Sequence, residues 1–98
     1  MGKYRINHSK VIKQTHEIDD LADDLQTEIT RLNNAYELSL TEWQGPAADE
    51  FRRKLSSLIS QISTTKDNMN SVARRIRAVA NAIQAEDERQ AEEAEALG

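Results

Sequence analysis

Apolar residues recur every seven positions along the first half of the chain, in two neighbouring rows. The rows consist of Val11, Ile18, Leu25 and Leu32, and of Ala22, Ile29, Tyr36 and Trp43. A seven-residue repeat places such residues on one face of an α-helix. The pattern therefore predicts a helix over about residues 7–43. Asn7 or Ser9 would cap its start, and Ile6 would pack against its first turn.

The second half of the chain carries the same repeat more regularly. One row consists of Ala48, Leu55, Ile62, Met69, Ile76 and Ile83, and the other of Phe51, Leu58, Thr65, Val72 and Val79. These two rows occupy the a and d positions of consecutive heptads, the pattern of a helix that packs against another helix. We expect a second helix over about residues 46–85.

The segment Trp43-Gln44-Gly45-Pro46 separates the two patterns and predicts a tight turn. Gly45 can adopt a left-handed conformation after the first helix, and Pro46 can open the next one. So short a connection makes the helices antiparallel, and residues whose numbers sum to about 90 should then lie side by side. This register places Val11 beside Val79, Ile18 beside Val72 and Leu32 beside Leu58. The fold class is therefore an all-α helical hairpin.

Further apolar residues lie beside these rows and predict a second packing surface. They are Leu21 and Ile29 in the first helix, and Ile59, Ala73 and Ala80 in the second. One core in a chain of 98 residues without cysteine supplies only about 3–5 kcal/mol, so association is expected. Two hairpins would form a four-helix bundle as a dimer. The expected hairpin and dimer interface comprises Val11, Ile18, Leu25, Ile29, Leu32, Tyr36, Phe51, Leu55, Leu58, Ile59, Ile62, Met69, Val72, Ile76, Val79 and Ile83.

Charges are segregated along the chain. Residues 7–43 carry three basic and eight acidic side chains, and residues 46–84 carry seven basic and three acidic ones. The expected register sets the acidic run from Glu17 to Asp24 opposite Lys66 and Arg74. Residues 86–98 carry six acidic side chains, one arginine and no apolar repeat, which indicates a frayed helix or a disordered tail. Residues 1–6 form an N-terminal extension to the hairpin domain of residues 7–85.

No group of side chains in the sequence predicts catalysis, a metal site or a cofactor site. His8 and His16 are eight residues apart and lack a third ligand. The acidic pairs of the first helix lie on a solvated face, and the serines of the second helix have no histidine nearby. We therefore expect a protein that is not an enzyme and binds no metal and no cofactor.

The sequence also disfavours nucleic-acid binding, a membrane-spanning segment and a cleaved signal peptide. The arginines at 74, 75 and 77 lack stacking aromatic residues, so pairing with acidic side chains is the better interpretation. No apolar stretch approaches the roughly 20 residues that span a bilayer. The first residues lack the apolar core of a signal peptide. Trp43 has two readings, a docking side chain for a partner or a lid that closes the bundle end over Phe51.

The run Trp43-Gln44-Gly45-Pro46-Ala47-Ala48-Asp49-Glu50-Phe51 and its flanking heptads resemble the WXG family of small, ESAT-like type VII secretion proteins. The resemblance covers residues 6 to about 85, with Trp43 and Gly45 as the turn motif. It implies hairpins that form homodimeric or heterodimeric four-helix bundles. It also implies export of the folded protein, made in the cytoplasm of a Gram-positive or actinobacterial cell, by a membrane ATPase.

The family's export signal, as the resemblance implies it, is a tyrosine followed four residues later by an acidic residue. The matching positions here are Ile83 and Asp87, so the acid is present and the tyrosine is absent. Two interpretations follow: a variant signal, or a chain whose partner carries the signal. The implied partners are a second copy, a paralogous small helical protein or a larger LXG-type toxin, besides the type VII secretion ATPase.

Overall fold

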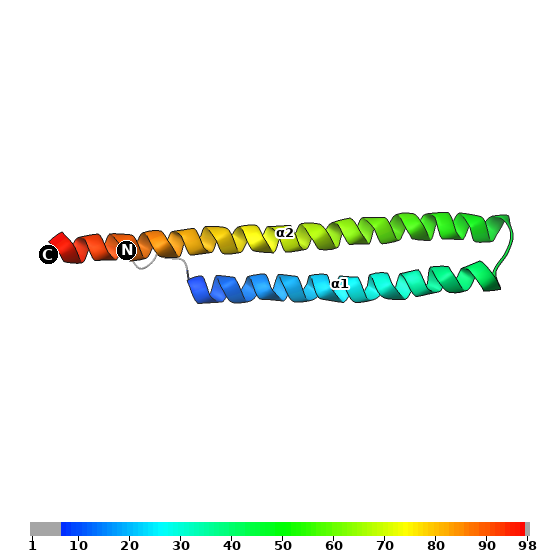
Figure 1. Ribbon diagram of the computed structural model, residues 1–98, viewed down its shortest axis with the longest axis horizontal. Coiled ribbons are helices and arrows are strands. Elements are labelled where there is room, and N and C mark those ends of the chain that lie inside the picture. Colours follow the sequence, from blue (N-terminus) through cyan, green and yellow to red (C-terminus); the bar gives the residue numbers. More distant parts are fainter. Residues whose placement is uncertain (1–6, 98) are drawn as a thin grey trace.

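The computed structural model describes residues 7–97 as two long α-helices joined by a short turn. Helix α1 spans His8–Glu42 and helix α2 spans Pro46–Leu97 (Figure 1). The helices lie side by side and antiparallel, in a rod with extents of 80 × 19 × 15 Å. The expected all-α hairpin is confirmed. The expected extension over residues 1–6, including the contact of Ile6, lies outside the described residues.

The start of each helix follows from local hydrogen bonding. The side chain of Asn7 caps α1 by accepting a bond from the backbone N–H of Lys10 at 3.1 Å. Gly45 has a φ of +113°, which side-chain-bearing residues rarely adopt. Its carbonyl accepts the first bond of α2 from the N–H of Asp49 at 3.0 Å, directly after Pro46 opens the helix.

α1 and α2 pack along one seam that is lined mainly by small side chains. The buried residues are Thr15, Ala22, Ile29 and Ser39 on α1, and Ala48, Leu55, Ala73 and Ala80 on α2. Small residues at a helix contact allow the backbones to approach closely. The seam is therefore narrow, and many large apolar side chains lie outside it.

The row of α2 that faces α1 differs from the expected one. We expected Phe51, Leu58, Val72 and Val79 in the seam, with Ile59, Ala73 and Ala80 left over, and this assignment was wrong. The four large residues are 40–58% exposed, whereas Ala73 and Ala80 are buried and Ile59 is half-buried. Close packing selects the alanine row, one residue further along the helix, and leaves the bulky row on the flank.

The antiparallel register agrees with the expected one. Hydrogen bonds join His8 to Asn81 at 2.7 Å, Gln26 to Lys66 at 2.8 Å and Ser39 to Arg52 at 2.9 Å. In each pair the residue numbers sum to about 90.

The expected ion pairing between the helices is largely absent from the described residues. Within residues 7–97, the one ion pair that joins α1 to α2 links Asp19 to Arg77, at 2.8 Å. Lys66 binds Gln26 and its neighbour Asp67 rather than the acidic run of α1. The other pairs lie within a helix, for example Glu28 with Arg31. Most acidic residues of α1 and most basic residues of α2 are therefore not paired with each other within the hairpin.

α2 continues well past the start of α1. We expected it to end near residue 85 and residues 86–98 to be frayed or disordered, but the helix runs to Leu97 (Figure 1). Alanine, glutamate, glutamine and arginine favour helix, and Arg89 bridges Glu86 and Glu93 on successive turns. No residue of 86–97 is buried. We call residues 86–97 the overhang.

Neither helix within residues 7–97 combines the length and the apolar character needed to cross a membrane.

Candidate interaction surface

Four large apolar side chains outside the seam form a stripe along one flank of α2. Phe51, Leu58, Val72 and Val79 are 40%, 45%, 46% and 58% exposed, respectively. They are spaced by sevens, with Thr65 completing the row, so they share one face of the helix. A row of exposed apolar residues over most of a helix indicates a surface that binds another protein.

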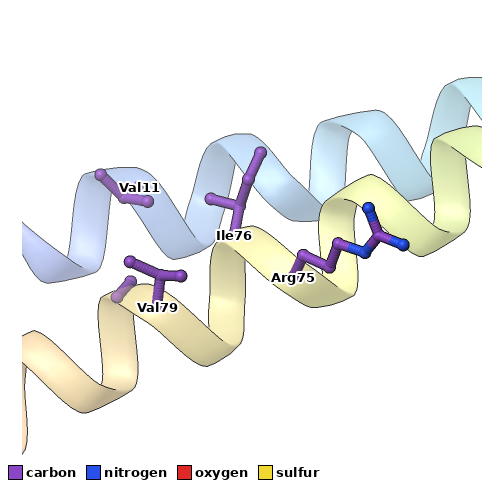
Figure 2. Close-up of a pocket in the computed structure, with 5 residues that line it drawn as sticks. Val11, Arg75, Ile76 and Val79 are labelled. Carbon is purple, nitrogen blue, oxygen red and sulfur yellow. The ribbon is translucent and has the colours of Figure 1, made fainter.

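The flank of α1 beside this stripe is also apolar. Val11, together with Ile76, Val79 and Ala80, lines a shallow hollow between the helices, and Arg75 lies at its edge. Figure 2 shows Val11 of α1 above Val79 of α2, with the side chain of Ile76 extending from α2 toward α1. Residues at seven-residue steps from Val11 continue the surface along α1 and are half-buried; they are Ile18, Leu25 and Leu32. We call this combined surface the apolar side.

The opposite flank of the hairpin is polar. There Lys66 bonds to Gln26 at 2.8 Å, and Arg77 bonds to Asp19 at 2.8 Å. The α2 residues spaced by sevens along this flank are Asp49, Ser56, Ser63, Asn70, Arg77 and Gln84. The hairpin thus has one side satisfied by its own hydrogen bonds and one side that is apolar. A second hairpin packed on the apolar side would complete a four-helix bundle.

Two polar residues of the seam were missed at the sequence level. Thr15 and Ser39 are 1% and 7% exposed, and arginines from α2 bond to both. The sequence did contain a signal, because Thr15 lies seven residues before Ala22 and Ser39 seven residues after Leu32. Both therefore extend the two apolar rows of α1. Because both residues are polar, a repeat defined by apolar residues does not include them.

The turn end of the rod carries an aromatic pair. The rings of Trp43 and Phe51 are tilted by 47°, with centroids 5.2 Å apart. Both side chains stay partly exposed, Trp43 at 43% and Phe51 at 40%. Trp43 therefore has features of both readings, since it packs over Phe51 and also presents a face to solvent. Phe51 links this aromatic pair to the stripe on α2.

The expected interface residues divide into three groups in the structure. Ile29 and Leu55 are buried in the seam. The half-buried group comprises Val11, Ile18, Leu25, Leu32, Tyr36, Ile59, Ile62, Met69 and Ile76. The exposed group comprises Phe51, Leu58, Val72, Val79 and Ile83. Residues of the first two groups thus form the seam, and residues of the last two groups form the apolar side.

The positions that match the export motif lie at the end of the hairpin opposite the turn. Ile83 is 38% exposed, and Asp87 follows it one turn later on α2. Residues four apart in a helix lie on the same face. Both positions come after Asn81, which contacts the first residue of α1, His8.

The histidines lie apart from any cluster of possible metal ligands. The Nε2 atom of His8 bonds to the side-chain oxygen of Asn81 at 2.7 Å, and His16 is exposed. Within residues 7–97, no three histidine or acidic side chains are grouped so that they could hold a metal ion.

Comparison with known proteins identifies one family. A family model described as "Proteins of 100 residues with WXG" matches residues 3–88 of the chain. Comparisons with curated proteins and with solved structures find no match.

Proposed function

The chain belongs to the WXG100 family of small helical proteins associated with type VII secretion, and from this premise we propose that it is a secreted helical hairpin that acts by binding other proteins as part of a folded dimer. Its action in this proposal is association without catalysis.

The apolar side is the observation that carries the proposal. A monomer would expose a line of large apolar residues from Phe51 to Val79 along one face of α2. The polar flank has its own cross-helix bonds, such as Lys66 to Gln26. In a four-helix bundle made from two hairpins, each hairpin has one side covered by the other hairpin and one side in contact with solvent. The apolar side and the polar flank of this chain match that arrangement. Burial of the stripe would add to the small core of the single hairpin.

Sedimentation at micromolar concentration tests the association. We expect a dimer for the wild type and a helical monomer for Leu58→Asp, because Leu58 lies on the apolar side and outside the seam. Leu55→Asp should instead unfold the hairpin, since Leu55 is buried. Ser57→Asp is the matched control, because Ser57 is exposed next to Leu58. A wild type that is folded and strictly monomeric would refute the dimer.

Export is tested in a Gram-positive or actinobacterial host with an active type VII machine. We expect the tagged chain in the culture medium of the parent strain and not of a strain without the secretion ATPase. Leu58→Asp should lower export, and Ser57→Asp should leave it unchanged. Retention of the wild type inside cells that export their own substrates would contradict the proposal.

A second candidate function is an adaptor that binds the N-terminal region of a larger LXG-type toxin and promotes its export. Ile83 in place of the family tyrosine favours it, because a partner would then supply the aromatic residue of the signal. Co-expression with a neighbouring toxin-like chain separates the two functions. A stable complex that the toxin needs for its own export supports the adaptor, and export of this chain alone supports the first proposal.

A further inference from the structure

We propose that residues 1–6 bind to the overhang of their own chain, along the face of α2 that α1 covers elsewhere. Arg5 pairs with Asp87 in this arrangement, and Ile6 packs against Ile83. The segment thereby stabilises the part of α2 that α1 does not reach. This contact lies within one chain, so it goes beyond the proposed function and does not depend on association.

The seam face of α2 continues into the overhang after α1 has ended. α1 begins at His8, whose side chain bonds to Asn81 at 2.7 Å, whereas α2 runs on to Leu97 (Figure 1). Seven-residue steps from the buried Leu55 and Ala80 mark this face. Beyond Asn81 its members are Ile83, Asp87, Gln90, Ala94 and Leu97. A face that packs against α1 along the hairpin is thus left without α1 at this end.

Asp87 has surroundings that the rest of the overhang lacks. It is half-buried, whereas the other residues of 86–97 are exposed. It also takes part in a polar interaction. No residue of α1 provides this cover, because His8 already lies opposite Asn81, and Asp87 is about 9 Å further along the helix. The residues directly before α1 are the part of the chain that reaches this face.

The start of α1 and the length of the overhang fit this placement. Asn7 caps α1 in an extended conformation, with φ −83° and ψ 90°, so helical geometry ends there. Traced backward from His8, the axis of α1 points along the overhang, because the two helices are antiparallel (Figure 1). Six extended residues reach about 20 Å, and residues 82–97 of α2 extend over about 24 Å. Residues 1–6 are therefore long enough to cover most of the overhang.

The charges of the two parts are complementary. The charged side chains of residues 1–6 are Lys3 and Arg5, whereas the overhang carries six acidic residues and one arginine. That arginine, Arg89, bonds to Glu86 and Glu93. The overhang therefore keeps a large excess of negative charge, which attracts a basic segment.

The spacing brings the matching side chains to the same level. An extended residue advances about as far as two helical residues. Counted from Asn7, which follows the level of the bond between His8 and Asn81, this places Ile6 beside Ile83 and Arg5 beside Asp87. Ile83 is 38% exposed and offers an apolar contact. Because the segment is joined to α1 next to this face, its local concentration there exceeds that of a free partner.

A nitroxide spin label on Gly2→Cys tests the contact, since the chain contains no other cysteine. The label broadens the amide NMR signals of residues that lie near it. We expect broadening over residues 88–97 and none over residues 46–60, at the turn end. Sharp signals throughout the overhang would overturn the proposal.

The labelled chain with Arg5→Glu separates a specific contact from the closeness that the covalent link imposes. Broadening over residues 88–97 should fall, and amide exchange there should speed up about two- to fivefold at about 50 mM salt. Lys13→Glu is the matched control, because it makes the same change in charge at an exposed position of α1. Equal behaviour of the two variants would refute the pair of Arg5 and Asp87.

Reversal of the pair gives a positive test. Arg5→Glu combined with Asp87→Arg should restore the broadening and the slow exchange that Arg5→Glu loses, because the attraction is re-formed with its charges exchanged. Circular dichroism of each variant checks that it is helical. A double variant that behaves like Arg5→Glu alone would contradict the pairing.

Mixing experiments distinguish this proposal from the proposed association. Spin-labelled chains without ¹⁵N are mixed with unlabelled ¹⁵N chains, so that any broadening arises between chains. Broadening of the overhang in this mixture would show that residues 1–6 bind a second copy, which would overturn the proposal and leave the association standing. A monomeric chain that shows the contact would support the proposal and refute the association.

Discussion

The hydroxyl of Thr15 on α1 accepts a hydrogen bond from the Nη1 atom of Arg77 on α2 at 3.1 Å. The same hydroxyl donates to the carbonyl of Ile12 at 2.7 Å, and Arg77 also holds Asp19 at 2.8 Å. Thr15 is 1% exposed, so its polar oxygen depends on these partners. A buried polar group that requires its partner stabilises one register of the helices and disfavours a shifted one.

Thr15→Val should lower the free energy of unfolding by about 1 kcal/mol, because Arg77 loses one acceptor and keeps Asp19. Urea denaturation followed by circular dichroism measures the loss at a fixed protein concentration. Thr30→Val is the control, since the Thr30 hydroxyl is exposed and bonds only to the carbonyl of Gln26. Equal effects of the two substitutions would show that the bond to Arg77 contributes no stability.

The end of α1 depends on one arginine of α2. Arg52 donates from Nη1 to the carbonyls of Ser39 and Trp43 at 2.9 and 3.0 Å, and its side chain is 12% exposed. The carbonyl of Ser39 also accepts from the backbone N–H of Trp43 at 3.1 Å, whereas the carbonyl of Trp43 lies past the end of α1, where carbonyls have no partners within the helix. Arg52→Met should therefore cost about 2 kcal/mol of unfolding free energy, measured by urea denaturation. Arg53→Met should cost less than about 0.5 kcal/mol, because Arg53 is 70% exposed and pairs only with Glu50.

A similar loss in both variants would contradict the role of Arg52 at the end of α1. Amide hydrogen exchange at residues 40–43 gives a second, local measurement. Exchange there should speed up in Arg52→Met and stay unchanged in Arg53→Met.

Gly45→Ala should destabilise the hairpin by about 1–3 kcal/mol through backbone strain alone. The φ of Gly45 is +113°, and a methyl group built there would meet no atom within 4 Å. Thermal unfolding measures the loss, with Gln44→Ala as the control at the neighbouring position. Gln44→Ala removes one exposed bond to the carbonyl of Leu40, so its effect should be about 0.5 kcal/mol or less. Wild-type stability of Gly45→Ala would show that the turn relaxes without strain.

The sequence predicts the hairpin, its turn and its register because a seven-residue repeat and a Gly-Pro break are local signals. It did not predict which rows of α2 face α1. Leu58 and Val72 are more hydrophobic than Ala73 and Ala80, so hydrophobicity alone assigns them to the core. Close approach of the helices selects the alanines instead. The bulky residues then stay partly exposed. In the proposed dimer they form the surface for a partner, a role that a single-chain pattern does not distinguish from a core.

The helical overhang depends on charge pairs that hydrophobic periodicity does not detect. Arg89 bonds to Glu86 and Glu93. The bond from Arg89 to Glu86 lowers the pKa of Glu86, with a smaller contribution from the bond from Gln90. Because the pKa of Glu86 is lowered in the helix, its ionised form stabilises this part of α2 at neutral pH. This stabilisation is lost as the pH falls through the lowered pKa of Glu86. Acidification should therefore weaken the helix at residues 86–97 before it affects the seam.

Arg89→Ala should raise the pKa of Glu86, and Gln90→Ala should raise it less, because the bond from Arg89 is the main cause of the lowering. Carboxyl ¹³C chemical shifts followed through a pH titration measure both changes. Amide exchange at residues 86–97 should speed up in Arg89→Ala at neutral pH, while the seam keeps its protection. Truncation after Ala85 should likewise leave the hairpin folded, since none of residues 86–97 is buried. A Glu86 titration in Arg89→Ala that matches the wild type would show that the arginine does not hold this end of α2.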